Sequence, residues 1–288
     1  MSDAAIVLPG GLWLDGAHHR DAELRLLTGE DEAFLLETGS SLPPARWTTL
    51  LLARCLTRLG PWEPVPAEAV RNLSVGDREA LLLHLRRLSR GDRLQCVLRC
   101  PEPACGERMD LDLDARDLLL PPYPNAAPWH QADVEEEGSL WRVRFRLPTG
   151  ADQEEAAALV RVEAATAADR ILRRCIDHIQ QDGAGPVAEI PAAVADRLAA
   201  LMAELDPQAE VTLQLSCPVC GRNFSSVFDA GAWLFQELAG AAAGLWREVH
   251  LLAFHYHWNE SEILRLTGRK RRLYLGLLAE ALGGESGR

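Results

Sequence analysis

"CPVCG", residues 217–221, holds two cysteines separated by two residues, with a proline between them and a glycine directly after. This pattern is typical of a zinc knuckle, which supplies two of the four ligands that a closed tetrahedral zinc site needs. The other half lies upstream in "CPEPACG", residues 100–106, where the gap is wider but within the range of zinc knuckles. The sequence therefore predicts one structural zinc per chain, bound by Cys100, Cys105, Cys217 and Cys220.

Strand-like segments flank both knuckles. "RLQCVLR" and "ERMDLDLD" enclose the first, and "EVTLQLS" and "RNFSSVFD" enclose the second. A strand, a tight cysteine turn and a returning strand form a zinc-ribbon hairpin. Because four thiolates leave no position for water, hydrolytic zinc chemistry is disfavoured. The alternatives are free thiols in turns or a redox pair, although a redox pair usually lies between a strand and a helix start.

The remaining cysteines are interpreted as packed side chains. Cys55 and Cys175 take equivalent positions in two amphipathic helices and are expected in the core. Cys96 precedes the first knuckle and is an alternative candidate ligand, but its counterpart in the second hairpin is Leu213. We therefore interpret Cys96 as a packed thiol.

Several segments recur in the same order, which indicates an internal duplication. "RLLTGEDEA" at 25–33 matches "RLPTGADQE" at 146–154, "LARCLTRL" at 52–59 matches "LRRCIDHI" at 172–179, and "VGDREALL" at 75–82 matches "VADRLAAL" at 194–201. The two knuckles complete the series. Each copy is expected to hold a strand, a capped helix, two further helices and a cysteine hairpin.

The predicted fold class is α+β, with two tandem pseudo-symmetric repeats that share one four-cysteine zinc site, followed by a helical tail. The N-terminal repeat is expected at 1–119. A proline-rich linker follows at 120–135, since "LPPYPNAAPWH" suits neither a helix nor a central strand. The second repeat is expected at 136–230 and the tail at 231–288.

Composition and charge limit the function. The 288 residues are 48% hydrophobic and 25% charged, as in soluble globular proteins. A net charge of −12 argues against a broad nucleic-acid surface, which needs a basic face. No apolar run approaches a membrane span, and the N-terminus lacks the pattern of a signal peptide. We expect a bacterial protein of the cytoplasm. In one interpretation, the protein becomes part of an assembled particle.

The tail is predicted to be a docking element. Its long apolar helix leads into "HYHW", and a second helix begins with a basic cluster after a break near Thr267 and Gly268; Asn259 or Ser261 is the expected cap. The candidate partner-binding residues are Phe254, His255, Tyr256, His257, Trp258, Arg269, Lys270, Arg271, Arg272 and Tyr274. Alternatives are a metal or acid–base role for His250, His255 and His257, a DNA-reading helix-turn-helix, or a solvated charge run.

A family resemblance rests on three stretches. "VLPGGLWLDGAHHRDAELRLLTGEDEAFL", with Leu8, Pro9, Gly10, Thr28, Gly29 and Asp31, resembles the opening of the baseplate hub assembly chaperones of contractile-tailed phages. Members of that family also carry knuckles like CPVCG. The tail "EVHLLAFHYHWNESEILRLTGRKRRLYL" is similar to a short segment of phage-tail-like contractile injection systems. The resemblance implies a role in a baseplate, either as a component or as an assembly chaperone.

The sequence contains no glycine-rich phosphate loop, nucleophile elbow or open metal site, so we expect a non-enzyme. The leading hypothesis is a zinc-stabilised structural or adaptor protein that binds other baseplate, spike or tube proteins. The alternative is a zinc-ribbon nucleic-acid-binding or transcription-associated protein. A metalloenzyme that uses the tail histidines is the third hypothesis.

Overall fold

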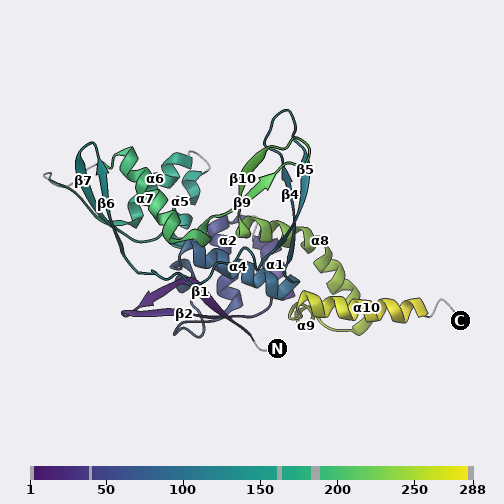
Figure 1. The fold of residues 1–288 in the computed structure, drawn as a ribbon. Coiled ribbons are helices and arrows are strands. Elements are labelled where there is room, and N and C mark those ends of the chain that lie inside the picture. Colours follow the sequence, from purple (N-terminus) through teal and green to yellow (C-terminus); the bar gives the residue numbers. More distant parts are fainter. Residues whose placement is uncertain (1–2, 39–40, 161–163, 183–188, 285–288) are drawn as a thin grey trace.

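The computed structural model describes residues 3–38, 41–160, 164–182 and 189–284, and shows a mixed α+β fold built from small antiparallel sheets and helices (Figure 1). The predicted α+β class is confirmed. The N-terminal half contains β1 (Ala4–Leu14), β2 (Ala17–Leu24), α1 (Gly29–Thr38), α2 (Pro44–Cys55), β3 (Leu56–Leu59), α3 (Ala67–Arg71), α4 (Val75–Arg90), β4 (Arg93–Arg99) and β5 (Arg108–Asp114).

The second half follows a similar order. It contains β6 (His130–Glu136), β7 (Ser139–Phe145), α5 (Gly150–Val160), α6 (Ala164–Cys175), β8 (Ile176–Gln181), α7 (Ala192–Leu205), a short 3-10 turn (Pro207–Ala209), β9 (Val211–Ser216) and β10 (Asn223–Phe228). The tail consists of α8 (Ala230–Tyr256), α9 (Glu260–Leu264) and α10 (Gly268–Gly284). Between β5 and β6, residues 120–129 contain no helix or strand.

Two three-stranded sheets and two hairpins carry the strands. The sheets have the orders β1-β2-β3 and β6-β7-β8, and the hairpins are β4-β5 and β9-β10. The four strands that the sequence predicts beside the knuckles are all present. β3 and β8 were not predicted, because each continues directly from the helix that ends at Cys55 or Cys175 without a glycine or proline break. Pairing with β2 and β7 decides their conformation, not local propensity.

The same polar network occurs once in each half. Asp31 is fully buried and binds the guanidinium groups of Arg25 and Arg54, while Thr28 donates to it from its backbone N–H and its hydroxyl. In the second half, Asp152 binds its surroundings in the same way. Its partners are Arg146, Arg174 and Thr149. The Thr-Gly helix starts are therefore held by an aspartate that is itself neutralised by arginines.

Burial opposes the ionisation of Asp152, but the hydrogen bonds from Arg146 and Thr149 outweigh it, so the pKa of this carboxyl falls to about 2. The pKa of Asp31 is lowered by the corresponding contacts with Arg25 and Thr28, against the effect of burial. Both aspartates are thus charged at neutral pH.

Each Thr-Gly start also forms a junction with another part of the chain. Thr28 pairs with Thr267 at the tail, and Thr149 pairs with Ser74 in the N-terminal half. Gly29 N–H donates to the Leu266 carbonyl at 3.1 Å, and Gly150 N–H donates to the Leu73 carbonyl at 3.2 Å. The predicted break near Thr267 is thus the start of α10 and a contact with α1.

A buried arginine covers the glycine at each junction. Arg271 and Arg78 are 2% and 1% exposed. A Cβ added to Gly29 would lie 2.8 Å from Nη1 of Arg271, and one added to Gly150 would lie 2.3 Å from Nη1 of Arg78. Both helix starts therefore need glycine for close approach.

A group of buried carboxylates joins the two halves. Asp77 Oδ1 accepts from the Gly10 N–H at 2.8 Å, and Asp206 accepts from the Gly76 N–H and the Tyr123 hydroxyl. Thus the "LPGG" stretch, the start of α4, the proline-rich segment and the end of α7 meet at one place. The Oδ2 atom of Asp77 is buried without a hydrogen-bond partner among the described residues. Burial raises the pKa of Asp77 to about 6.

Asp77→Asn is expected to remove part of the pH dependence of stability. A carboxyl whose pKa is higher in the folded state than in the unfolded chain stabilises the fold when protonated, and this contribution is lost as pH rises. Between pH 5 and 7 the wild-type free energy of unfolding should fall by about 1 kcal/mol more than that of the variant. Denaturant titrations at several pH values measure this difference. Parallel curves for the two proteins would show that Asp77 titrates normally.

Candidate metal centre

The four knuckle cysteines lie at the ends of two hairpins. β4-β5 and β9-β10 stand side by side and project from the helical body (Figure 1). In each hairpin the ladder continues to the first cysteine of the knuckle: Cys100 N–H donates to the Glu107 carbonyl at 2.8 Å, and Cys217 N–H donates to the Arg222 carbonyl at 2.9 Å. The turns then bring Cys105 and Cys220 back toward these positions. Gly106 and Gly221 follow with φ of 60° and 73°, a conformation that favours glycine.

The sulfur atoms form a compact cluster. All four lie within 4.8 Å of one another. The Cys100 and Cys220 sulfurs are 3.6 Å apart, and the Cys105 and Cys217 sulfurs are 3.8 Å apart. A tetrahedron with Zn–S bonds of about 2.3 Å has S–S edges of roughly 3.8 Å. The four cysteines therefore fit a metal ion, and all of them are free thiols and not disulfides.

Backbone amides surround the thiol sulfurs. The N–H groups of Cys220 and Val219 donate to Cys217 and lower the pKa of this thiol to about 7. The N–H groups of Glu102 and Glu107 also donate to Cys100 and Cys105, but burial and the neighbouring thiols outweigh them, so the pKa of Cys100 is raised to about 12 and that of Cys105 is raised as well. Such donors stabilise negative charge on sulfur and orient thiolate ligands around a metal.

Contacts outside the cluster also join the hairpins. Met109, Leu98 and Phe224 pack beside Cys100 and Cys217, and Arg222 forms an ion pair with Glu102 across the two turns. This apolar cluster is small and contains few buried residues. A bound metal would therefore be the main link at this end of the molecule.

The other cysteines lie where the sequence predicts. Cys55 and Cys175 are fully buried in the cores of the two halves. Burial raises the pKa of Cys175 to about 12 and that of Cys55 further. Cys96 is half-buried in β4, faces Leu111 in the register, and does not belong to the four-thiol cluster.

The candidate partner-binding residues fall into three groups. Tyr256, Trp258 and Tyr274 pack on one another with ring centroids 4.9–5.8 Å apart, and His255 is also half-buried. Arg271 is buried and pairs with Glu32 and Glu248 of the same chain. The exposed members are Phe254, His257, Arg269, Lys270 and Arg272.

The tail also contains the predicted helix cap. Of the two candidates, Asn259 and Ser261, Asn259 caps α9 and forms a capping box with Glu262. α8 ends at Tyr256 because His257 takes a left-handed conformation with φ of 56°. Within the described ranges, the four cysteines are the one group of three or more possible metal ligands, and His250, His255 and His257 form none.

The architecture defines a mixed α+β protein whose two hairpins carry a cysteine cluster able to hold a metal ion. Residues 51–231 match the family model described as T4 bacteriophage base plate protein, and the chain belongs to this family. The predicted resemblance to a phage baseplate family is thereby confirmed. The matched segment includes both knuckles, whereas the "LPGG" stretch and the tail lie outside it.

No match was found among curated proteins or among solved structures. In the part of the chain that the structure describes, no helix has the length and hydropathy needed to cross a membrane.

Proposed function

We propose that the protein is a zinc-stabilised, non-enzymatic structural or adaptor protein in the baseplate of a phage tail or contractile injection system. The observation that carries this proposal is the four-thiol cluster within the segment that matches the baseplate family. Cys100, Cys105, Cys217 and Cys220 would hold Zn²⁺ with four thiolates. Zinc would then supply cross-linking of distant chain segments and no Lewis-acid chemistry, because no ligand position stays open.

Two copies of one ancestral unit would explain why the knuckles lie in separate halves. The networks around Asp31 and Asp152 support this proposal, since each contains the same residue types in the same hydrogen-bonded arrangement. The shared order of strands, helices and hairpin supports it as well. In this interpretation, the zinc joins the two copies after their duplication.

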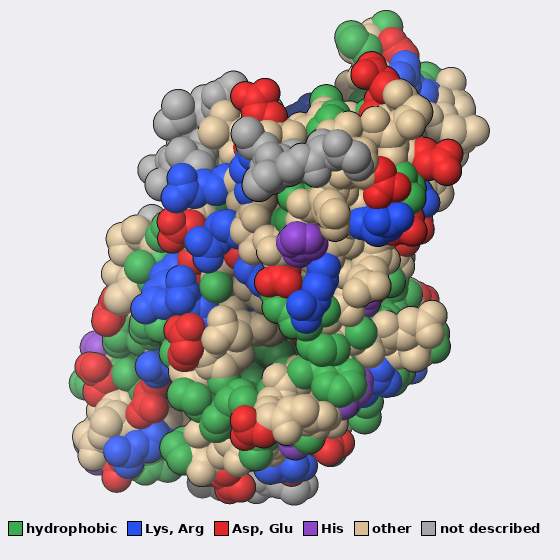
Figure 2. Space-filling view, turned by 90° about the vertical axis from the view of Figure 1, so that its left-hand side faces the viewer, with side chains coloured by type: hydrophobic (Ala, Val, Ile, Leu, Met, Phe, Trp, Pro, Cys, Tyr) green, Lys and Arg blue, Asp and Glu red, His purple; other side chains and the backbone are tan. Residues whose placement is uncertain are grey.

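The tail would bind neighbouring baseplate proteins. Phe254 is 67% exposed at the end of α8, and Arg269, Lys270 and Arg272 are exposed at the start of α10. The tail thus exposes an apolar side chain on one helix and basic groups on another, which suits a partner surface with both apolar and acidic parts. Elsewhere, the face in Figure 2 shows acidic and basic side chains interspersed, which does not favour a nucleic-acid surface there.

Phe254→Ser should weaken partner binding without weakening the fold. Its ring is exposed, so the free energy of unfolding should change by less than about 0.5 kcal/mol. Loss of an anchoring aromatic side chain from an interface costs about 2 kcal/mol or more. Comparing Tm and the yield of co-purified baseplate proteins tests both parts. Undiminished co-purification would place the docking surface elsewhere.

Affinity purification of the tagged protein from its native host, with mass spectrometry of the bound proteins, tests the proposed function. Recovery of sheath, tube, spike or baseplate proteins is the expected result. If the tagged protein is present in mature particles, it is a baseplate component. If it is found only in assembly intermediates, it is an assembly chaperone. Recovery of polymerase subunits or nucleic acid in their place would overturn the proposal.

A further inference from the structure

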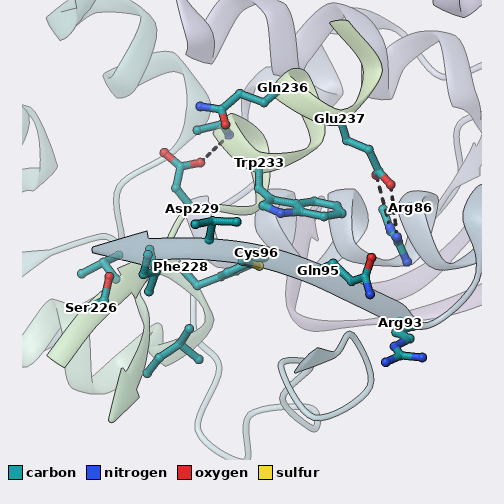
Figure 3. A pocket seen from close by; sticks show the side chains of 15 residues that line it. Arg86, Arg93, Gln95, Cys96, Ser226, Phe228, Asp229, Trp233, Gln236 and Glu237 are labelled. Atoms are coloured by element: carbon teal, nitrogen blue, oxygen red, sulfur yellow. Dashed lines mark hydrogen bonds and ion pairs between the residues drawn. The ribbon is translucent and has the colours of Figure 1, made fainter. Parts of the chain in front are cut away.

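A groove of about 890 Å³ lies between β4, β10 and the start of α8 (Figure 3). Consecutive residues of two strands line it, namely 95–98 of β4 and 226–228 of β10. Successive side chains of a strand point to opposite faces, so a lining of consecutive residues from β4, with none from β5, means that β4 presents its edge to the groove. β10 contributes consecutive residues as well, together with Leu213 of its partner strand β9. Trp233 and Gln236 of α8 form another wall.

Both edges carry unpaired backbone groups. Within the described residues, β4 pairs with β5 alone and β10 with β9 alone. The Cys100 N–H donates to the Glu107 carbonyl, and alternation along the register makes Gln95 and Val97 non-hydrogen-bonded with β5. Their N–H and C=O groups therefore point away from β5. In the second hairpin, the Cys217 N–H bonds to the Arg222 carbonyl, and the same alternation makes Val227 non-hydrogen-bonded with β9. The backbone groups of Val227 therefore point away from β9.

The side chains of these edges are unusually apolar for exposed positions. Val97 is 50% exposed and Val227 is 55% exposed. Natural edge strands are normally protected by charges, prolines or bulges, and an unprotected apolar edge favours pairing with another strand. Trp233 lies over β4, the strand that carries Gln95 and Cys96, and adds a broad apolar surface beside the backbone groups (Figure 3).

We propose that this groove binds an extended segment of another baseplate protein, which adds as a strand to the free edge of β4 and reaches β10. This inference rests on the proposed baseplate function. The segment would have about five to seven residues, which is the usual length of a β-strand. A helix satisfies its own backbone groups and would leave those of both edges unpaired, so it fits the groove less well.

Charge at the two ends of the groove defines the segment further. Arg93 lies at the start of β4 with a side chain 72% exposed and forms an ion pair with Asp112 at the surface. Asp229 lies near the other end of this strand (Figure 3), and its Oδ1 accepts from the Ala232 N–H at the start of α8. A segment that runs antiparallel to β4 would be complementary with a basic residue at its beginning and an acidic residue at its end. Alternate apolar side chains between them would contact Val97, Val227 and Trp233.

Site-specific photo-cross-linking tests the proposal in the full chain. A benzoylphenylalanine is placed at Val97 on the groove edge of β4 or, as the matched control, at Asp110, which faces Val97 from the opposite edge of the same hairpin. Both proteins are produced in cells that assemble the particle. We expect position 97, but not 110, to cross-link to one short segment of another baseplate protein.

Several outcomes would overturn the inference. They are no cross-link from position 97, equal cross-linking from both positions, or a cross-link to a second copy of this chain or to a helical segment. If baseplate proteins still co-purify, the proposed function survives such a result. If no baseplate protein co-purifies at all, the proposed function fails and this inference fails with it.

A synthetic peptide of the cross-linked segment provides the second measurement. Val97→Pro removes an outward N–H without breaking a β4-β5 ladder bond, and Asp110→Pro does the same on the other edge. In calorimetric titrations with the full-length protein, Val97→Pro should weaken peptide binding by about tenfold or more, as loss of a backbone hydrogen bond predicts. Asp110→Pro should leave the affinity unchanged. Equal weakening by both variants would contradict edge pairing.

Discussion

Cys217→Ser is expected to release the metal and to destabilise both halves of the chain. The Cys217 sulfur is 3.8 Å from that of Cys105, and the Cys217 side chain is only 1% exposed. Solvent therefore cannot supply the metal with a ligand in place of this sulfur. Because metal binding and folding are coupled, losing one of four thiolates should lower the free energy of unfolding by about 3–5 kcal/mol. Metal analysis by mass spectrometry and denaturant unfolding of the same preparation measure the two effects.

Cys96→Ser is the matched control. Cys96 lies in the strand that leads to Cys100 but outside the cluster, so its loss should leave the metal content unchanged. A chelator should lower the Tm of the wild type and of this variant, and should have little effect on Cys217→Ser. If Cys217→Ser kept a full equivalent of metal and the wild-type stability, a shared centre between the two hairpins would be excluded.

Much of this centre could be predicted from the sequence because its signals are local. A knuckle combines ligands, a proline and a positive-φ glycine within a few residues, and alternating apolar residues identify its flanking strands. The number of knuckles and the repeated segments predict that the two knuckles pair. The four sulfurs do meet in the structure, although the knuckles lie more than a hundred residues apart in the chain.

The junctions were out of reach of sequence patterns because they depend on distant partners. Nothing local in "RLTGRKRR" distinguishes the buried Arg271 from the exposed Arg269 and Arg272. Arg271 is buried because Glu32 and Glu248 approach it from two other helices. Likewise, a serine and a glycine at the start of α4 do not reveal that Asp206 will bind the Gly76 amide. The glycines common to the two Thr-Gly starts were the available signal for close packing.

The joint around Gly76 shows how narrow these contacts are. Gly76 N–H donates to Oδ2 of Asp206 at 2.9 Å, and a Cβ added to Gly76 would lie 1.9 Å from Oδ1 of the same carboxylate. Asp206 is 2% exposed and also accepts from the hydroxyl of Tyr123. Its side chain is short and held from two sides, so it cannot move aside without losing both hydrogen bonds.

Gly76→Ala should therefore displace a buried carboxylate and lower the free energy of unfolding by about 3 kcal/mol or more, through the steric overlap and the lost hydrogen bonds. Gly240→Ala is the matched control, since an added Cβ there meets no atom within 4 Å in an exposed turn of α8. Alanine at position 240 should be neutral or stabilising by up to about 1 kcal/mol. Denaturant unfolding of both variants measures the two free energies. Equal stabilities would mean that the contact between Gly76 and Asp206 adapts to an added methyl group, and that it does not hold the two halves of the chain together.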